Sequence, residues 1–130
     1  MVERPLSPHM TVYKWSYTMT LSILHRVSGL ALFGTLLVMI VWLAAAARGP
    51  DAYRDAMGTL ASAPFKCLIA VALLALCYHF CNGLRHLAWD VGLGFERAQA
   101  RRSAVIVVIV ALLAFAVCVY YLACTAPGAA

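Results

Sequence analysis

Three long stretches of the chain are apolar and free of charge. No Asp, Glu, Lys or Arg occurs between Arg26 and Arg48, between Lys66 and Arg85, or after Arg102. The first two stretches hold about 21 and about 18 residues, and a helix of about 20 apolar residues crosses a hydrocarbon core of about 30 Å. The pattern predicts three transmembrane helices, near residues 19–47, 64–91 and 103–124.

The composition agrees with a membrane protein. Hydrophobic residues make up 65% of the 130 residues and charged residues only 12%, whereas soluble domains average about 45–50% and about 25%. We therefore expect an all-α, integral membrane bundle of three transmembrane helices that forms a single domain over residues 1–130. A bundle of this size leaves no room for a separate catalytic domain, so soluble chemistry would have to come from a partner.

The basic residues are better interpreted as determinants of topology than as a nucleic-acid footprint. The net charge is +5, but the basic residues are scattered along the chain. The first connection between predicted helices is balanced in charge, with Arg48 and Arg54 against Asp51 and Asp55. The second connection is basic, with Arg97, Arg101 and Arg102 against Glu96, and the N-terminal segment adds Arg4 and Lys14. The positive-inside rule then places the N-terminus and the second connection on the cytoplasmic or matrix side.

Two further expectations concern the N-terminal segment and the first connection between the predicted helices. The first twenty residues lack the short apolar core and cleavage site of a signal peptide. This favours a bacterial inner-membrane protein, with a mitochondrial inner-membrane protein as the alternative. In the first connection, Ala56, Met57 and Leu60 could share one face of a short amphipathic helix.

The second predicted helix carries polar residues near its end. His79 and His86 are seven positions apart and so project from nearly the same face, with Gly83 between them. An imidazole beside a glycine fits an axial haem ligand, with the macrocycle over Gly83 and His86 near its edge. The alternatives are a histidine that bonds to another helix and a glycine that serves helix packing. Arg85, His86 and Asp90 could equally extend to the membrane interface.

The first predicted helix carries a second polar cluster. Ser22, Arg26 and Gly29 form an i, i+4, i+7 stripe, and His25 lies next to it. An arginine at this depth needs an anion or a strong acceptor, such as a haem propionate or a quinone carbonyl. A lipid phosphate is the alternative partner. A haem bound by two histidines would need its second ligand from another chain, because histidines on one helix face cannot bind opposite faces of one porphyrin.

Four segments resemble one family. They are RPLSPH (residues 4–9), TVYKW (11–15), SILHRVSG (22–29) and HFCNGLRHLAWD (79–90). Together they resemble the cytochrome b556 subunits of succinate dehydrogenase, which anchor respiratory complex II in the membrane. The third predicted helix resembles the family only in being apolar.

The resemblance implies a role for each matched residue. It implies that His79 is the axial ligand of haem b and that His25, Arg26 and His86 lie near the haem propionates. It also implies that Ser22 and Arg26 belong to the ubiquinone site, with Ile23 and Trp15 lining that pocket.

The resemblance also implies partners and a function. Haem b would be shared with a second three-helix anchor subunit, which gives the other histidine. A flavoprotein with FAD would oxidise succinate, and an iron–sulfur subunit would pass the electrons to ubiquinone. The chain would thus couple the tricarboxylic acid cycle to the respiratory chain without being catalytic alone. The alternatives are an anchor of a quinol:fumarate reductase, and a haem-free structural anchor or small transporter subunit.

Overall fold

The computed structural model describes residues 15–125, which form four helices. These are α1 (Tyr17–Arg48), α2 (Pro50–Leu60), α3 (Ala63–Asp90) and α4 (Arg97–Thr125). Helices α1, α3 and α4 are long and apolar enough to cross a membrane, and the described part of the chain contains no strand. The expected fold class is confirmed. The segment at residues 4–9 and all of the next segment except Trp15 lie outside the described residues.

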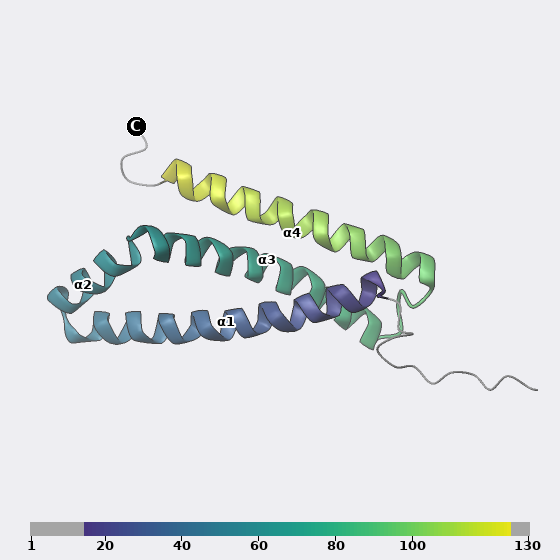
Figure 1. The fold of residues 1–130 in the computed structure, drawn as a ribbon, viewed down its shortest axis with the longest axis horizontal. Coiled ribbons are helices and arrows are strands. Elements are labelled where there is room, and N and C mark those ends of the chain that lie inside the picture. Colours follow the sequence, from purple (N-terminus) through teal and green to yellow (C-terminus); the bar gives the residue numbers. More distant parts are fainter. Residues whose placement is uncertain (1–14, 126–130) are drawn as a thin grey trace, which may run out of the picture.

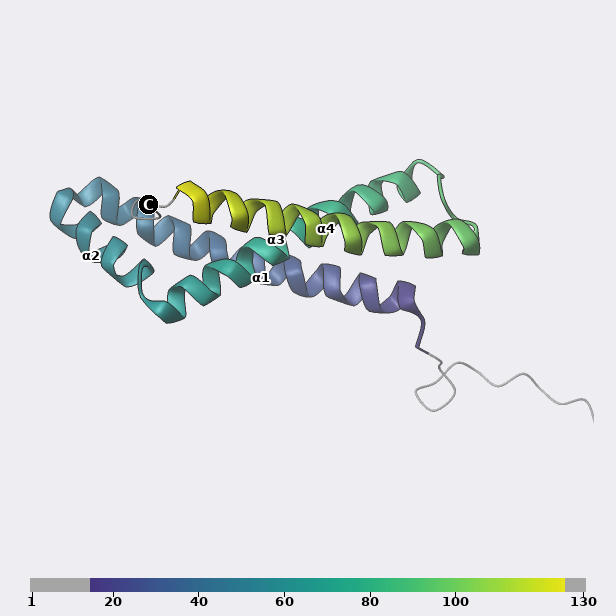
Figure 2. The same ribbon diagram turned by 90° about the horizontal axis from the view of Figure 1, so that it is seen from above.

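The three long helices extend along the length of the bundle, with α3 crossing α1 at an angle, and α2 forms the connection between α1 and α3 at one end (Figures 1 and 2). The start of α1 and the connection from α3 to α4 lie at the same end of the bundle (Figure 1). Helix α3 packs against both α1 and α4, and α1 also contacts α4. The polar residues of α3 therefore face partners on two different helices.

Local sequence explains where the helices begin and end. The Ser16 side chain caps α1 by accepting a hydrogen bond from the Met19 amide at 3.4 Å. Helix α1 ends at Arg48 and is followed by Gly49, whose φ of 115° is accessible to glycine without a steric penalty. Helix α4 begins at Arg97, six residues before the predicted start at residue 103. The prediction counted only the uncharged stretch, whereas the helix also includes the arginines that precede it. Charge limits the apolar stretch but does not limit the helix.

Helix α2 confirms the short helix expected in the first connection. Ala56 and Leu60 are half-buried, whereas Met57 is exposed. The shared face therefore includes only two of the three residues that were expected on it. On the outer side, Arg54 and Asp51 form an exposed ion pair at 3.4 Å.

Small side chains form the contacts between the long helices. The buried apolar residues of the described chain are Leu21, Ala72, Ala100, Ala104, Val107 and Ala111. Small residues let helix backbones approach closely, which is how helices associate in membranes. Most large apolar side chains point outward, where lipid or other membrane subunits can cover them.

Candidate functional site

His79 on α3 is held by two oxygen atoms of α1. Its Nδ1 nitrogen lies 3.1 Å from Oγ of Ser28 and 3.2 Å from the carbonyl oxygen of His25. The Ser28 hydroxyl donates its own proton to that carbonyl at 2.7 Å, so both oxygens act as acceptors toward Nδ1. The proton of a neutral His79 ring therefore lies on Nδ1, and Nε2 keeps its lone pair. An imidazole fixed in this way is the form in which histidine binds a metal.

Three histidine rings form a cluster between α1 and α3. The rings of His25 and His79 are stacked, with centroids 4.0 Å apart and planes 13° from parallel. The ring of His86 lies 5.1 Å from that of His25 and packs edge-on against Trp89 at 5.3 Å. Nδ1 of His25 is buried and has no hydrogen-bond partner among the described residues. The cluster thus contains an unsatisfied polar atom that a bound group could pair with.

Two glycines make room for histidines of the facing helix. A Cβ atom added to Gly29 would lie 3.0 Å from Cε1 of His79, and one added to Gly83 would lie 3.7 Å from Cε1 of His25. The His25 ring therefore lies in van der Waals contact with Gly83 in this structure. This contact fits the alternative in which Gly83 serves helix packing, and the placement of a macrocycle over Gly83 stays a prediction.

Arg85 does not extend to the membrane interface. Its side chain is only 6% exposed, and it donates to Oγ of Ser103 at 3.0 Å and to the carbonyl oxygen of Ala100 at 3.1 Å. Its guanidinium also lies over the Trp89 ring, 4.1 Å from the centroid. The interfacial interpretation of Arg85 is wrong because α4 supplies these acceptors, and sequence spacing on α3 could not reveal them. Asp90 is exposed, as that interpretation expected.

Polar contacts that the sequence did not indicate join α3 to α1. The Tyr78 hydroxyl donates to the carbonyl oxygen of Leu21 at 2.8 Å, and the amide nitrogen of Asn82 approaches the same oxygen at 3.5 Å. Asn82 is fully buried and also lies next to Arg85, with 3.5 Å between Oδ1 and Nη1. The available signal in the sequence was an asparagine four residues after a tyrosine in an apolar stretch. These bonds fix α3 between its two neighbours.

The residues expected at a quinone site lie along α1 and just before it. Ser22 is half-buried, whereas Arg26 and Ile23 are exposed and Trp15 is 73% exposed. Hydrogen bonds to other described residues are absent for the side chains of Ser22 and Arg26. Their polar groups are therefore available to a bound molecule or to another chain.

The fold and the cluster together define a class: a three-helix membrane protein with histidines held between its helices. The family model for the succinate dehydrogenase/fumarate reductase transmembrane subunit matches residues 2–118. The chain belongs to this family, and the resemblance noted from its motifs is confirmed.

Curated relatives agree with this assignment. The succinate dehydrogenase cytochrome b556 subunit of Rickettsia prowazekii is 44% identical over 98 residues, which cover 72% of this chain and 73% of the relative. The mitochondrial cytochrome b560 subunits of Mus musculus and Homo sapiens are 40% and 36% identical, and each match covers 85% of this chain and 67% of the relative. The chain is thus similar to both bacterial and mitochondrial members.

Proposed function

We propose that this chain is a membrane-anchor subunit of a succinate:ubiquinone oxidoreductase of the bacterial inner membrane. In this role His79 is an axial ligand of haem b, and Ser22 and Arg26 form part of the ubiquinone-reduction site. The names of the relatives support the assignment of this chain to that complex. The observation that carries the haem assignment is the bonding of Nδ1 of His79 to two acceptors, which leaves Nε2 for iron.

The residues of the cluster fit a haem b group. A haem supplies one-electron redox chemistry, and its propionates are anions. The unsatisfied Nδ1 of His25, together with Arg26 and His86, would hold those propionates. The rings of His25 and His79 are stacked face to face with centroids 4.0 Å apart, which leaves no room for an iron atom between them. A second histidine ligand would therefore come from another chain.

The ubiquinone site requires walls from other subunits. Ser22 supplies a neutral donor for a quinone carbonyl, and Arg26 supplies a fixed positive charge one helical turn away. Ile23 and Trp15 would cover the quinone ring from the side of this chain. Because three of these residues are exposed and Ser22 is only half-buried, the second anchor subunit and the iron–sulfur subunit would complete the pocket. FAD would belong to the flavoprotein. This chain would position the haem and the quinone and supply the electrostatic environment around them.

A reduced-minus-oxidised optical spectrum of the complex, purified through a tag on this chain, tests the haem assignment. The complex should show a b-type band, and His79→Ala should lose it. His86→Ala should keep the band, because His86 is assigned to the propionates. Succinate oxidation by a soluble dye reports assembly of the partner subunits and should persist in both variants.

An unchanged band in His79→Ala would reassign the ligand, and no band in the unaltered complex would favour a haem-free anchor. An anchor of a quinol:fumarate reductase would show the band but favour fumarate reduction.

A further inference from the structure

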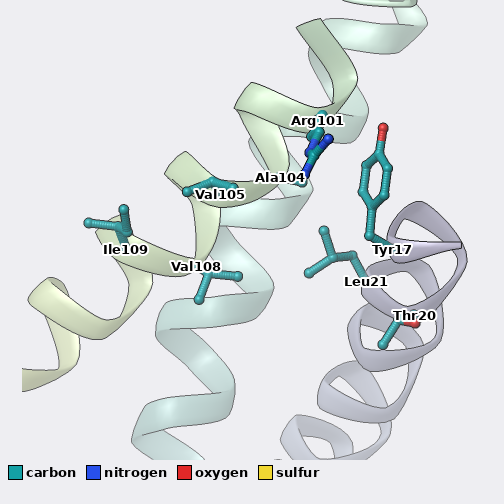
Figure 3. A pocket seen from close by; sticks show the side chains of 8 residues that line it. All are labelled: Tyr17, Thr20, Leu21, Arg101, Ala104, Val105, Val108 and Ile109. Atoms are coloured by element: carbon teal, nitrogen blue, oxygen red, sulfur yellow. The ribbon is translucent and has the colours of Figure 1, made fainter. Parts of the chain in front are cut away.

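A groove on the far side of α1 from Arg26 is not used by the proposed haem and quinone sites. It lies between the first turns of α1 and the first half of α4, and its volume is about 750 Å³. Its lining residues are Tyr17, Thr20, Leu21, Arg101, Ala104, Val105, Val108 and Ile109. Figure 3 shows Arg101 and Tyr17 at one end of the groove and Ile109 at the other. The groove is therefore apolar along its length and cationic at one end.

The charge at this end has no partner within the described chain. Arg101 is exposed, and residues 15–125 contain a single ion pair, which is formed by Arg54 and Asp51 on α2. Arg102 lies beside it, and both arginines line a second hollow of about 590 Å³ that shares Val105 with the groove. Two arginines that line the same hollow beside apolar side chains are suited to a phosphate with attached hydrocarbon.

The groove wall beside Arg101 is amphipathic and is linked to α4 by a hydrogen bond. The Tyr17 hydroxyl donates to the carbonyl oxygen of Arg97 at 3.3 Å, which links the start of α1 to the start of α4. A tyrosine held in this way presents its ring to the groove and its hydroxyl to the membrane surface, which is the usual position of tyrosine at a membrane interface. An apolar helix of another subunit would cover the walls and leave the arginines unpaired.

We propose that this groove is a binding site for an anionic glycerophospholipid. The phosphate lies at Arg101 and Arg102, and an acyl chain follows Leu21, Ala104 and Val108 toward Ile109. The lipid comes from the leaflet on the side of the N-terminus, which the positive-inside rule assigns to the cytoplasm. This site is independent of the haem and quinone assignments.

The test uses the complete complex in nanodiscs of phosphatidylcholine that contain spin-labelled phosphatidylglycerol or spin-labelled phosphatidylcholine. Electron paramagnetic resonance measures the motionally restricted fraction of each lipid, and their ratio gives the preference for the anionic lipid. Arg101→Gln should lower this preference about tenfold, because it removes a direct charge-assisted hydrogen bond to the phosphate as well as the charge. Arg97→Gln is the matched control, since it removes the same charge one helical turn earlier on α4 without altering a residue that lines the groove. It should lower the preference by about fivefold at most, which is the contribution of a cation near an anionic surface that makes no direct contact with the lipid.

A second variant tests the apolar part of the groove. Val108→Trp places a large side chain in the groove at an exposed position and should reduce the restricted fraction of both lipids. Dye-linked succinate oxidation and the b-type spectrum confirm that each variant complex is intact. Equal effects of Arg101→Gln and Arg97→Gln would mean that the preference for the anionic lipid comes from diffuse surface charge, and would overturn the proposed site. Cross-linking of Val108→Cys to another membrane subunit would show that protein covers the groove, and would overturn it as well.

Discussion

The imidazole ring of His79 on α3 lies against that of His25 on α1, with 4.0 Å between centroids. The contact joins two helices at residues that are 54 positions apart in the sequence, and the carbonyl oxygen of His25 also accepts from Nδ1 of His79. One residue of α1 thus sets both the stacking and the tautomer of the proposed haem ligand. The environment of His79 can therefore be altered from α1 without changing His79 itself.

Gly29→Ala should disturb His79 directly. The added Cβ atom would lie 3.0 Å from Cε1 of a ring that is held by two hydrogen bonds, so the ring cannot move away freely. Overpacking of this kind typically costs about 1–3 kcal/mol. We expect the complex to lose haem at a lower temperature. The measurement is the decrease of the b-type absorption during heating.

Gly34→Ala is the matched control for Gly29→Ala. It lies on the same helix, and an added Cβ atom there would meet no atom within 4 Å. Alanine is a better helix former than glycine by about 0.8–1.0 kcal/mol, so this variant should be as stable as the original or more stable. Equal destabilisation by the two substitutions would show that the space beside His79 is not limiting.

Ser28→Ala should weaken haem binding without removing the ligand. The change deletes one of the two acceptors of Nδ1, and loss of such a supporting bond lowers metal-site affinity by about 10–100-fold. Thr35→Ala is the control, because its hydroxyl bonds only to a carbonyl oxygen of its own helix, that of Ala31 at 3.0 Å. Haem retention measured by titration with a competing haem-binding protein should separate the two variants. A similar loss in both would point to a general effect on α1.

Ser22→Ala should lower ubiquinone reduction about two- to tenfold at subsaturating quinone, as loss of one hydrogen bond of about 0.5–1.5 kcal/mol implies. Arg26→Leu should lower it further, because hydrogen bonds to charged groups are stronger. Thr20→Ala removes a hydroxyl two residues earlier that bonds the carbonyl oxygen of Ser16, and it should have no effect. Dye-linked succinate oxidation should persist in all three variants. Ubiquinone reduction at the unaltered rate in Ser22→Ala would exclude Ser22 from the pocket.

Arg85→Ala should destabilise the contact between α3 and α4. The change removes bonds to Ser103 and Ala100 and the contact with Trp89, and part of this loss is offset because a charged group no longer has to be buried. We expect a net loss of about 2–4 kcal/mol, measured by thermal unfolding of the complex in detergent. Arg54→Ala removes an exposed ion pair and should change stability by less than about 1 kcal/mol. Equal stability of the two variants would show that the buried guanidinium contributes nothing.

A reporter fused after Ala130 should report the periplasmic side. The start of α1 and the arginine-rich start of α4 lie at one end of the bundle (Figure 1), and the positive-inside rule places that end in the cytoplasm. Three crossings then carry the C-terminus to the opposite side. Paired fusions of alkaline phosphatase and green fluorescent protein make the measurement. Fluorescence with no phosphatase activity would mean that one of the three helices does not cross.

The sequence by itself determined the three long helices and the family. Both depend on local information: the length of an uncharged apolar stretch sets a membrane span, and the spacing of His79, Gly83 and His86 sets a common helix face. The short helix between the first two spans was also predictable, because its apolar and polar residues alternate with helical period. The start of α4 was not, since arginines at a membrane boundary do not reveal whether the backbone is already helical.

Only the tertiary structure decided what each of these faces meets. The bond from His79 to Ser28 joins residues 51 positions apart, and the bond from Arg85 to Ser103 joins residues 18 apart on different helices. Such contacts depend on the rotation and axial register of one helix against another. Register is set by close approach at small residues such as Gly29, Gly83 and Ala104, and helical periodicity within one segment carries no information about it. For this reason the sequence identified the histidines, while the folded bundle determined which ring nitrogen is free and which arginine is buried.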